Sequence, residues 1–237
     1  MRLNWETALV GAVVTLRPYR ACHVRRYHGW MSDAALREAT ASDELTLGEE
    51  LANQRSWLDD EAKLTFIVCA TAAAGGGAGL RAALPADATS GMCGDANLFF
   101  LKPEHTAEDA AAAGAAAGAA VAEVMVMVAD AGLRRRGLAG EAVCALLRYG
   151  MERRGVAAAV AKISAGNAPS LALFAKLGFV VAKRVPAFDE VHLVAGPAQR
   201  LRERVYDVTA RAGYAEAADV ADADAEAAAA AEVAAAR

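Results

Sequence analysis

Apolar positions along this chain recur with two spacings, one typical of β-strands and the other of α-helices. Alternating or β-branched apolar runs predict strands, at residues 13–19, 64–69, 94–101, 121–128, 157–164, 179–184 and 190–194. Apolar residues at helical spacing lie between these strands, at residues 23–31, 138–154 and 167–177. An antiparallel beginning followed by strand–helix–strand units predicts an α/β (α+β) fold, with a mixed, mostly antiparallel central sheet and helices on both faces.

Alanine-rich segments interrupt this pattern twice, at about residues 70–92 and 104–120. Each falls where a hairpin connection is expected, and a long surface insertion there has a low thermodynamic cost. We therefore expect both insertions to be disordered or loosely helical. Residues 207–237 are rich in alanine and acids, which predicts a disordered or loosely helical tail whose deletion leaves the fold intact. The predicted organisation is a single domain over residues 1–206 followed by this tail.

Composition narrows the classes of function. A chain of 237 residues, 56% of them hydrophobic, can bury one sizeable core. The net charge is −4, and residues 207–237 hold seven acids against two arginines, a charge of −5, so the rest of the chain is near +1. Such a balance gives no broad positive field that would attract nucleic acid or anionic membranes.

The sequence contains no recognisable targeting signal and no metal-binding motif. No apolar run resembles a secretion signal or a membrane span, which predicts a cytoplasmic protein, with entry to the nucleus left open. The four cysteines form no C-x-x-C pair and the four histidines share no clean face, so no metal ligand set is predicted.

A basic, glycine-containing loop follows the predicted strand at 121–128 and opens the next helix. Its residues are Arg134, Arg135, Arg136, Gly137, Leu138, Ala139 and Gly140. The first N–H groups of a helix favour an anion, glycine lets the backbone approach a ligand, and arginine matches phosphate geometry. The loop therefore predicts a pyrophosphate cradle, and the alternative is a basic helix N-terminus on a solvated surface. Its form, R-x-x-G-x-A, is neither a P-loop nor the dinucleotide fingerprint G-x-G-x-x-G.

The second informative stretch is residues 167–179, which read NAPSLALFAKLGF. Asn167 suits the start of a helix, Pro169 its first turn, and Gly178 the position just after its end. Apolar residues recur between them at helical spacing. The stretch therefore predicts a short helix with one apolar face, directly after the predicted strand at 157–164.

Together these two elements resemble the acetyl-CoA loop and the last shared element of the GCN5-related N-acetyltransferase (GNAT) superfamily. The strand and helix within residues 13–31 are similar to the opening of its RimJ/RimL-like branch. TASDELTL at 40–47 and GDANLF at 94–99 most resemble the eukaryotic N-acetyltransferase 9-like proteins. The resemblance covers residues 1 to about 195, and it implies acetyl-CoA as co-substrate and a V-shaped splay between the fourth and fifth strands.

The resemblance also implies which residues form the site. In the splay, the backbone of Met127, Val128 and Ala129 is expected to pair with the pantetheine arm and to place the thioester. The loop 134–140 is expected to hold the pyrophosphate. Asn167 is expected to contact the co-substrate or a bound water near the reacting centre, and its alternative role is a simple helix cap.

Acid–base chemistry is less well determined. Glu123 is the best candidate for the general base because its strand points into the expected cleft, and the alternative is a solvated carboxylate at the strand end. Many relatives have a tyrosine where Phe174 stands, and phenylalanine donates no proton. Either water protonates the thiolate, another residue such as Tyr149 or Ser170 helps, or catalysis is weak.

The leading hypothesis is an N-acetyltransferase that transfers acetyl from acetyl-CoA to an amine, of a protein or peptide in preference to a small molecule. That substrate preference comes from the branch resembled and from no residue here. The alternative is a catalytically weak or inactive acetyl-CoA-binding protein that works through partner contacts. A nucleic-acid binder would rest on three arginines alone, without interleaved aromatics. Neither the acceptor amine nor the oligomeric state follows from the sequence.

Overall fold

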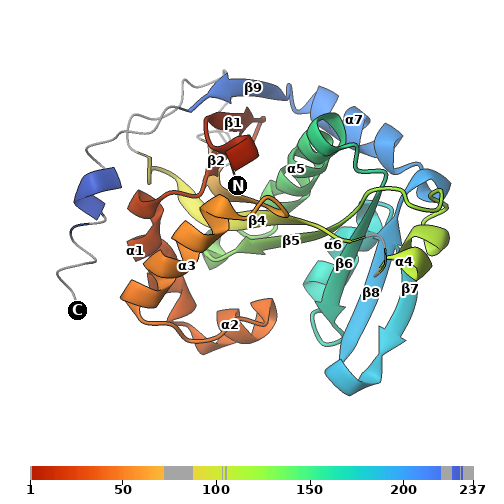
Figure 1. Ribbon diagram of the computed structural model, residues 1–237, viewed down its shortest axis with the longest axis horizontal. Helices are drawn as coiled ribbons and strands as arrows, with labels where there is room; N and C mark the ends of the chain where they lie inside the picture. The colour runs from red at the N-terminus through yellow and green to blue at the C-terminus, as the bar shows by residue number, and fades with distance from the viewer. Residues whose placement is uncertain are drawn as a thin grey trace. The chain divides into compact units, whose positions relative to one another are not determined.

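The computed structural model describes residues 2–71, 88–102, 104, 106–219, 226–229 and 231 (Figure 1). The chain divides into two compact units that interleave in sequence. The first comprises Met1–Asp95, Met127–Leu138 and Ala215–Arg237, and the second comprises Ala96–Val126 and Ala139–Tyr214. Three elements begin in one unit and end in the other: β4 (Met92–Phe100), β5 (Val121–Val128) and α5 (Leu138–Arg154).

In the first unit the strands follow the order β4-β3-β2-β1-β9. Its further elements are β1 (Thr7–Val10), β2 (Val14–Pro18), α1 (Ala21–Met31), α2 (Ala34–Thr40), α3 (Leu47–Asp59), β3 (Lys63–Ala70) and β9 (Ala215–Ala218). The pairs β1–β2, β2–β3 and β1–β9 are antiparallel. Helices α1 and α3 pack on each other (Figure 1). Their apolar side chains share one core cluster with the sheet, which includes Tyr19, Tyr27, Leu51, Ile67 and Met127.

In the second unit the strands follow the order β7-β8-β6-β5-β4. Its further elements are α4 (Ala107–Ala112), β6 (Ala158–Ser164), α6 (Ala168–Lys176), β7 (Val180–Val185), β8 (Glu190–Ala195) and α7 (Leu201–Arg211). Strands β5 and β6 are parallel, whereas β6–β8 and β7–β8 are antiparallel. The predicted class, a mixed and mostly antiparallel sheet accompanied by helices, is confirmed.

The parallel ladder between β5 and β6 is short. It joins Val121 to Ala158 and ends at the pair Glu123–Val160. Strand β5 nevertheless continues to Val128, and the remainder of β6 pairs with β8. The backbone pairing of β5 and β6 thus stops midway along the two strands, as the splay predicted between them requires.

The second predicted insertion, residues 104–120, contains an ordered helix. Helix α4 and the residue after it place Ala110 and Ala113 in a buried cluster with Val121 and neighbouring strand residues. This segment therefore differs from the loose one expected, because small side chains let the backbone pack closely: a Cβ added to Gly196 would lie 2.7 Å from the Ala113 carbonyl oxygen. The first predicted insertion falls mainly on residues 72–87, which lie outside the described residues.

The tail also differs from the expectation for residues 207–219. Helix α7 continues to Arg211, and β9 pairs with β1 from Ala215 opposite Val10 to Ala218 opposite Thr7 (Figure 1). The backbone of an alanine-rich strand can complete a sheet edge without large side chains, because the hydrogen bonds come from the main chain. The ordered chain thus continues beyond the predicted boundary at residue 206.

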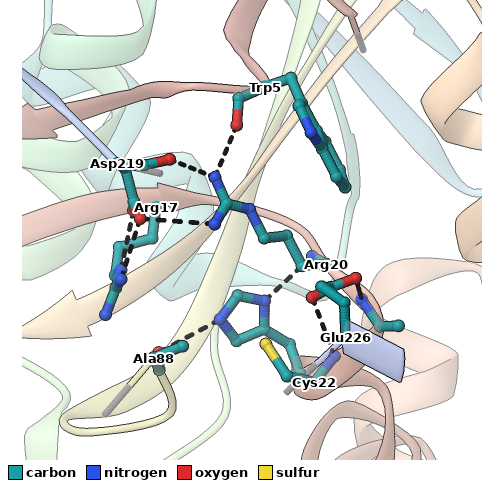
Figure 2. Close-up of polar contacts among 9 residues, drawn as sticks. Trp5, Arg17, Arg20, Cys22, Ala88, Asp219 and Glu226 are labelled. Atoms are coloured by element: carbon teal, nitrogen blue, oxygen red, sulfur yellow. Dashed lines mark hydrogen bonds and ion pairs between the residues drawn. The ribbon is translucent and has the colours of Figure 1, made fainter. Parts of the chain in front are cut away.

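Two buried arginines hold the tail directly after β9. Arg17 donates from Nε and Nη2 to the Asp219 carboxylate, at 2.8 and 2.9 Å (Figure 2). The two side chains are only 7% and 2% exposed. Arg20 donates to the backbone oxygens of Asp219 and Trp5, the latter at 2.7 Å. Asp219 thereby connects the tail to both arginines.

The tail also reaches the first turn of α1. Glu226 accepts hydrogen bonds from the backbone N–H groups of Ala21 and Cys22, at 3.1 and 3.4 Å (Figure 2). At the same helix start, the Arg20 N–H donates to His23 Nδ1 at 3.0 Å. A carboxylate at a helix N-terminus is favourable because it meets unpaired N–H groups and the positive end of the helix dipole.

The described part of the chain offers neither a membrane span nor a metal cluster. None of its helices is long and apolar enough to cross a bilayer. None of its histidine, cysteine, aspartate and glutamate side chains are grouped so that three could hold a metal ion.

Candidate functional site

The carboxyl end of β5 is fixed by its contact with β4. The Ala129 N–H donates to the Cys93 carbonyl at 2.8 Å. A Cβ added to Gly94 would lie 1.9 Å from the carbonyl oxygen of Met127 and 2.9 Å from its carbonyl carbon. Only glycine allows this approach, because real Cβ atoms do not come so near a backbone atom. The segment predicted to place the thioester, residues 127–129, therefore lies in close backbone contact with β4.

The arginine loop that follows is closed by local hydrogen bonds. Asp130 accepts from the Gly132 N–H at 2.8 Å and begins a short 3₁₀ turn. The Arg134 guanidinium turns back and donates to the Val128 carbonyl at 2.9 Å and to the Ala129 carbonyl at 3.2 Å. Arg134 therefore ties the predicted pyrophosphate loop to the predicted thioester segment. Each carbonyl has a second lone pair that stays available to a ligand.

The rest of the loop has the backbone of an anion site. Arg135 and Gly137 have left-handed φ angles of 65° and 88°, which is the alternation that turns successive N–H groups toward one side. An added Cβ at Gly137 would meet no atom within 4 Å. Buried Leu138 anchors the start of α5, and the side chains of Arg135 and Arg136 are exposed. Ala139 and Gly140 lie half-buried in the first turn.

Asn167 is the N-cap of α6, in the second unit. Its Oδ1 accepts a hydrogen bond from the Ser170 N–H at 3.2 Å. The capping role offered as its alternative is thus present in the structure, while its role near the co-substrate stays a prediction. Phe174 of the same helix is 3% exposed and packs edge-on against Phe179, with ring centroids 5.0 Å apart. It is a core residue.

The remaining candidates for proton transfer are constrained by their surroundings. Glu123 lies at the end of the β5–β6 ladder, and its carboxylate is 2.7 Å from the ammonium nitrogen of Lys162. Tyr149 is 1% exposed, inside the core, with Arg153 over its ring. The assignment of Glu123 as general base stays a prediction, with Lys162 as a competing partner.

Two buried acids near the β5 end were missed by the sequence reasoning. Glu50 of α3 and Asp95 of β4 are 3% and 5% exposed, and both belong to the first unit. Burial, and then the charge of Asp95, raise the pKa of Glu50 from 4.5 to about 7. A signal was present, because Glu50 stands among Leu47, Leu51 and Gln54 on the inward-facing side of α3. A carboxylate at an apolar helical position indicates a functional site or a specific partner.

A family model and relatives of known name match most of this chain. Residues 14–180 match the family model described as an acetyltransferase (GNAT) domain. An N-acetyltransferase 9-like protein of Nematostella vectensis is 39% identical over 193 residues, covering 81% of this chain and 87% of that protein. The alpha/beta-tubulin-N-acetyltransferase 9 of Homo sapiens is also 39% identical, over 194 residues, covering 81% of this chain and 84% of that protein.

Solved structures show the same fold at low identity. Spermidine N-acetyltransferase from Vibrio cholerae, in complex with CoA and spermine, superposes with a TM-score of 0.60 at 14% identity, covering 79% of this chain and 98% of that one. The aminoglycoside acetyltransferase AAC(6')-Ib with coenzyme A has a TM-score of 0.55 at 18% identity, covering 81% and 99%.

Proposed function

Because this chain belongs to the acetyltransferase (GNAT) family, we propose that it transfers the acetyl group of acetyl-CoA to an amine of a protein or peptide. The chain is an acyltransferase that uses acetyl-CoA as co-substrate. A protein substrate is supported by relatives from human, mouse and fly, which are named alpha/beta-tubulin-N-acetyltransferase 9.

The observation that carries the proposal is that Arg134 joins the arginine loop to the end of β5. In the proposed complex, the backbone of Met127–Ala129 pairs with the pantetheine arm, and the loop N–H groups and cations receive the pyrophosphate. The residues present fit these groups, because Gly137 has open space around its Cα, and Arg135 and Gly137 have the positive φ angles found in backbone anion-binding turns. The thioester supplies the activated acetyl group, and the protein aligns it with the amine.

Calorimetry of acetyl-CoA binding tests the site, with two matched glycine variants. We expect Gly137→Glu to abolish binding, because it places bulk and negative charge where the pyrophosphate approaches. Gly155→Glu is the control: this exposed glycine also has a positive φ, of 64°, and open space around it, but lies beyond the end of α5. The same backbone strain is introduced in both. Equal affinities in both variants would remove the loop from the site.

The acceptor class is tested by mass spectrometry of competing amines. The set contains a peptide with only its α-amine free, the same peptide with only a lysine amine free, and spermidine. Acetylation of either peptide ahead of spermidine supports the proposal, and the pattern identifies which amine reacts. Acetylation of spermidine alone would overturn the protein or peptide substrate.

One observation favours a catalytically weak protein as the second candidate. Phe174 is buried and has no proton to donate, so α6 offers no phenol at this position to the leaving thiolate. Tight acetyl-CoA binding without acetylation of any amine in the set would identify this alternative. Turnover by the wild type excludes it.

A further inference from the structure

A small pocket lies between α5, the end of α6 and α7, and all the residues that line it belong to the second unit. Its volume is about 200 Å³, and its floor is formed by Cys144, Leu147, Phe179, Leu201 and Val205, each at most 4% exposed. Burial raises the pKa of the Cys144 thiol to about 12, so this side chain is neutral and behaves as a small apolar group. An apolar cavity of about 150 Å³ can hold benzene, so this pocket has room for a ring or a chain of about six carbons.

The rim of the pocket carries more positive than negative charge. Lys176, Arg204 and Arg211 line it together with a single acid, Asp207. Asp207 is already paired, because its Oδ2 accepts a hydrogen bond from Arg211 Nη2 at 2.6 Å. Lys176 and Arg204 are exposed, and the side chain of neither forms an ion pair or a hydrogen bond with any described residue. The rim therefore offers two cations that the described part of the chain does not neutralise.

The position of Arg204 depends on Gly178, which follows the end of α6. This glycine has a left-handed φ of 91°, and a Cβ added to it would lie 2.7 Å from Arg204 Nε and 3.1 Å from Arg204 Cζ. The missing side chain leaves room for the guanidinium beside the last turn of α6, which contains Lys176. The helix dipole accounts for cations at a helix C-terminus, but it does not account for the apolar pocket beside them.

We propose that this pocket binds a small apolar carboxylate, with its hydrocarbon part on the floor and its carboxylate at Lys176 and Arg204. Arginine presents a planar fork of N–H donors that matches a carboxylate, and lysine adds a second positive charge. The hydrocarbon part is needed as well, because an ion pair at an exposed rim contributes little by itself, whereas each buried methylene raises the affinity about fourfold. The inference does not depend on the proposed acetyl transfer.

The pocket is distinct from the residues of the second unit that are predicted to contact the co-substrate. Asn167 is at the amino end of α6, whereas Lys176 is at its carboxyl end. On α5, the residues of the arginine loop form the first turn, and Cys144 and Leu147 follow about one and two turns later. A ligand in the pocket would therefore occupy a second site.

An NMR titration with three probes tests the charge and the hydrocarbon part of the ligand separately. The probes are hexanoate, its uncharged twin hexanamide, and acetate, each added to the full chain while the methyl signals of Leu147, Leu201 and Val205 are followed. Hexanoate should bind at least about tenfold more tightly than either of the other two probes. Equal affinities of hexanoate and hexanamide would overturn the carboxylate site, and so would shifts spread over the whole surface of the protein.

Matched variants test the role of the two free cations. Arg204→Gln and Lys176→Gln should each weaken the binding of hexanoate by about threefold, and they should leave the binding of hexanamide unchanged. Arg202→Gln is the control, because Arg202 is an exposed cation of the same helix, α7, that does not line the pocket. An equal loss of hexanoate binding in Arg202→Gln would show a general attraction of anions and overturn the site.

Filling the pocket tests the role of its apolar floor. Val208 is half-buried and lines the pocket, so the larger side chain in Val208→Trp should occupy the space of the hydrocarbon and reduce hexanoate binding to the level of acetate. Thermal denaturation identifies the folded variants, and Leu177→Trp repeats the test from α6, since Leu177 also lines the pocket. Undiminished binding of hexanoate by a folded variant of either kind would overturn the inference.

Discussion

The first unit buries two groups of charged residues that differ in the signs of charge they bring together. Arg17, Arg20 and Asp219 combine opposite charges, and hydrogen bonds join them at short range (Figure 2). Glu50 and Asp95 combine like charges, and the result is a raised pKa of Glu50. The first arrangement connects distant parts of the chain, whereas in the second burial disfavours the charged form of Glu50. Opposite charges therefore connect two buried segments, whereas an acid buried beside another acid is destabilising in its charged form.

Removing Asp219 from its group with Arg17 and Arg20 has the largest expected effect on the free energy of unfolding. Asp219→Ala leaves two buried guanidinium groups without their carboxylate, and we expect a loss of about 3–5 kcal/mol of unfolding free energy. Deleting the chain from Asp207 should be at least as destabilising, contrary to the expectation from sequence, because β9 is removed as well. Urea denaturation measures both changes. Asp207→Ala is the control, since its ion pair with Arg211 is exposed and contributes about 0–1 kcal/mol. Similar losses for the two aspartates would contradict the comparison.

Removing one acid from the like-charge pair should have the opposite sign. The folded-state pKa of Glu50, about 7, is above its ordinary value of 4.5, so the folded protein binds this proton more tightly than the unfolded chain. Stability contributed by protonation is complete below about pH 4.5 and is lost as the pH rises to about 7. Glu50→Gln should therefore stabilise the protein by up to about 3 kcal/mol at pH 8 and by little at pH 4.

Thermal denaturation of Glu50→Gln and wild type at both pH values measures this difference. The exposed Glu38→Gln should show no such pH dependence. A Glu50→Gln variant that is less stable than wild type at pH 8 would mean that the charged carboxylate has a stabilising partner.

The smallest effect is expected at Glu123, whose charge is compensated near the surface. Its pair with Lys162 is 16% and 36% exposed, so Glu123→Gln should cost about 1 kcal/mol or less. If Glu123 is not the general base, kcat for this variant stays within about threefold of the wild-type value, measured with the peptides of the competing-amine assay. A loss of about 100-fold would support Glu123 as the general base.

Local patterns in the sequence predicted the elements that form the proposed co-substrate site. The strand at 121–128, the loop and the next helix are contiguous, and so is the helix that begins after Asn167, so spacing and caps were sufficient. The splay required the family resemblance, because a ladder that stops midway leaves no mark in apolar spacing. The burial of Glu50 and Asp95 was missed because it arises only after α3 packs against the sheet.

The prediction for the tail was wrong for a different reason. Asp219 and Glu226 lie among alanines and other acids, where an acid normally indicates a solvated segment. Their partners, Arg17 and the first turn of α1, are about 200 residues earlier in the chain. No local pattern connects positions so far apart.

The pairing of Arg17 with Asp219 also has a consequence during synthesis. The two residues are 202 positions apart, so at about 5–20 residues per second the ribosome needs about 10–40 s to supply the acid after the arginine. Throughout that interval β1 lacks its β9 neighbour and presents an open strand edge. An unpaired strand edge can pair with other chains, so slow translation of the last segment would prolong the exposure of this edge to aggregation.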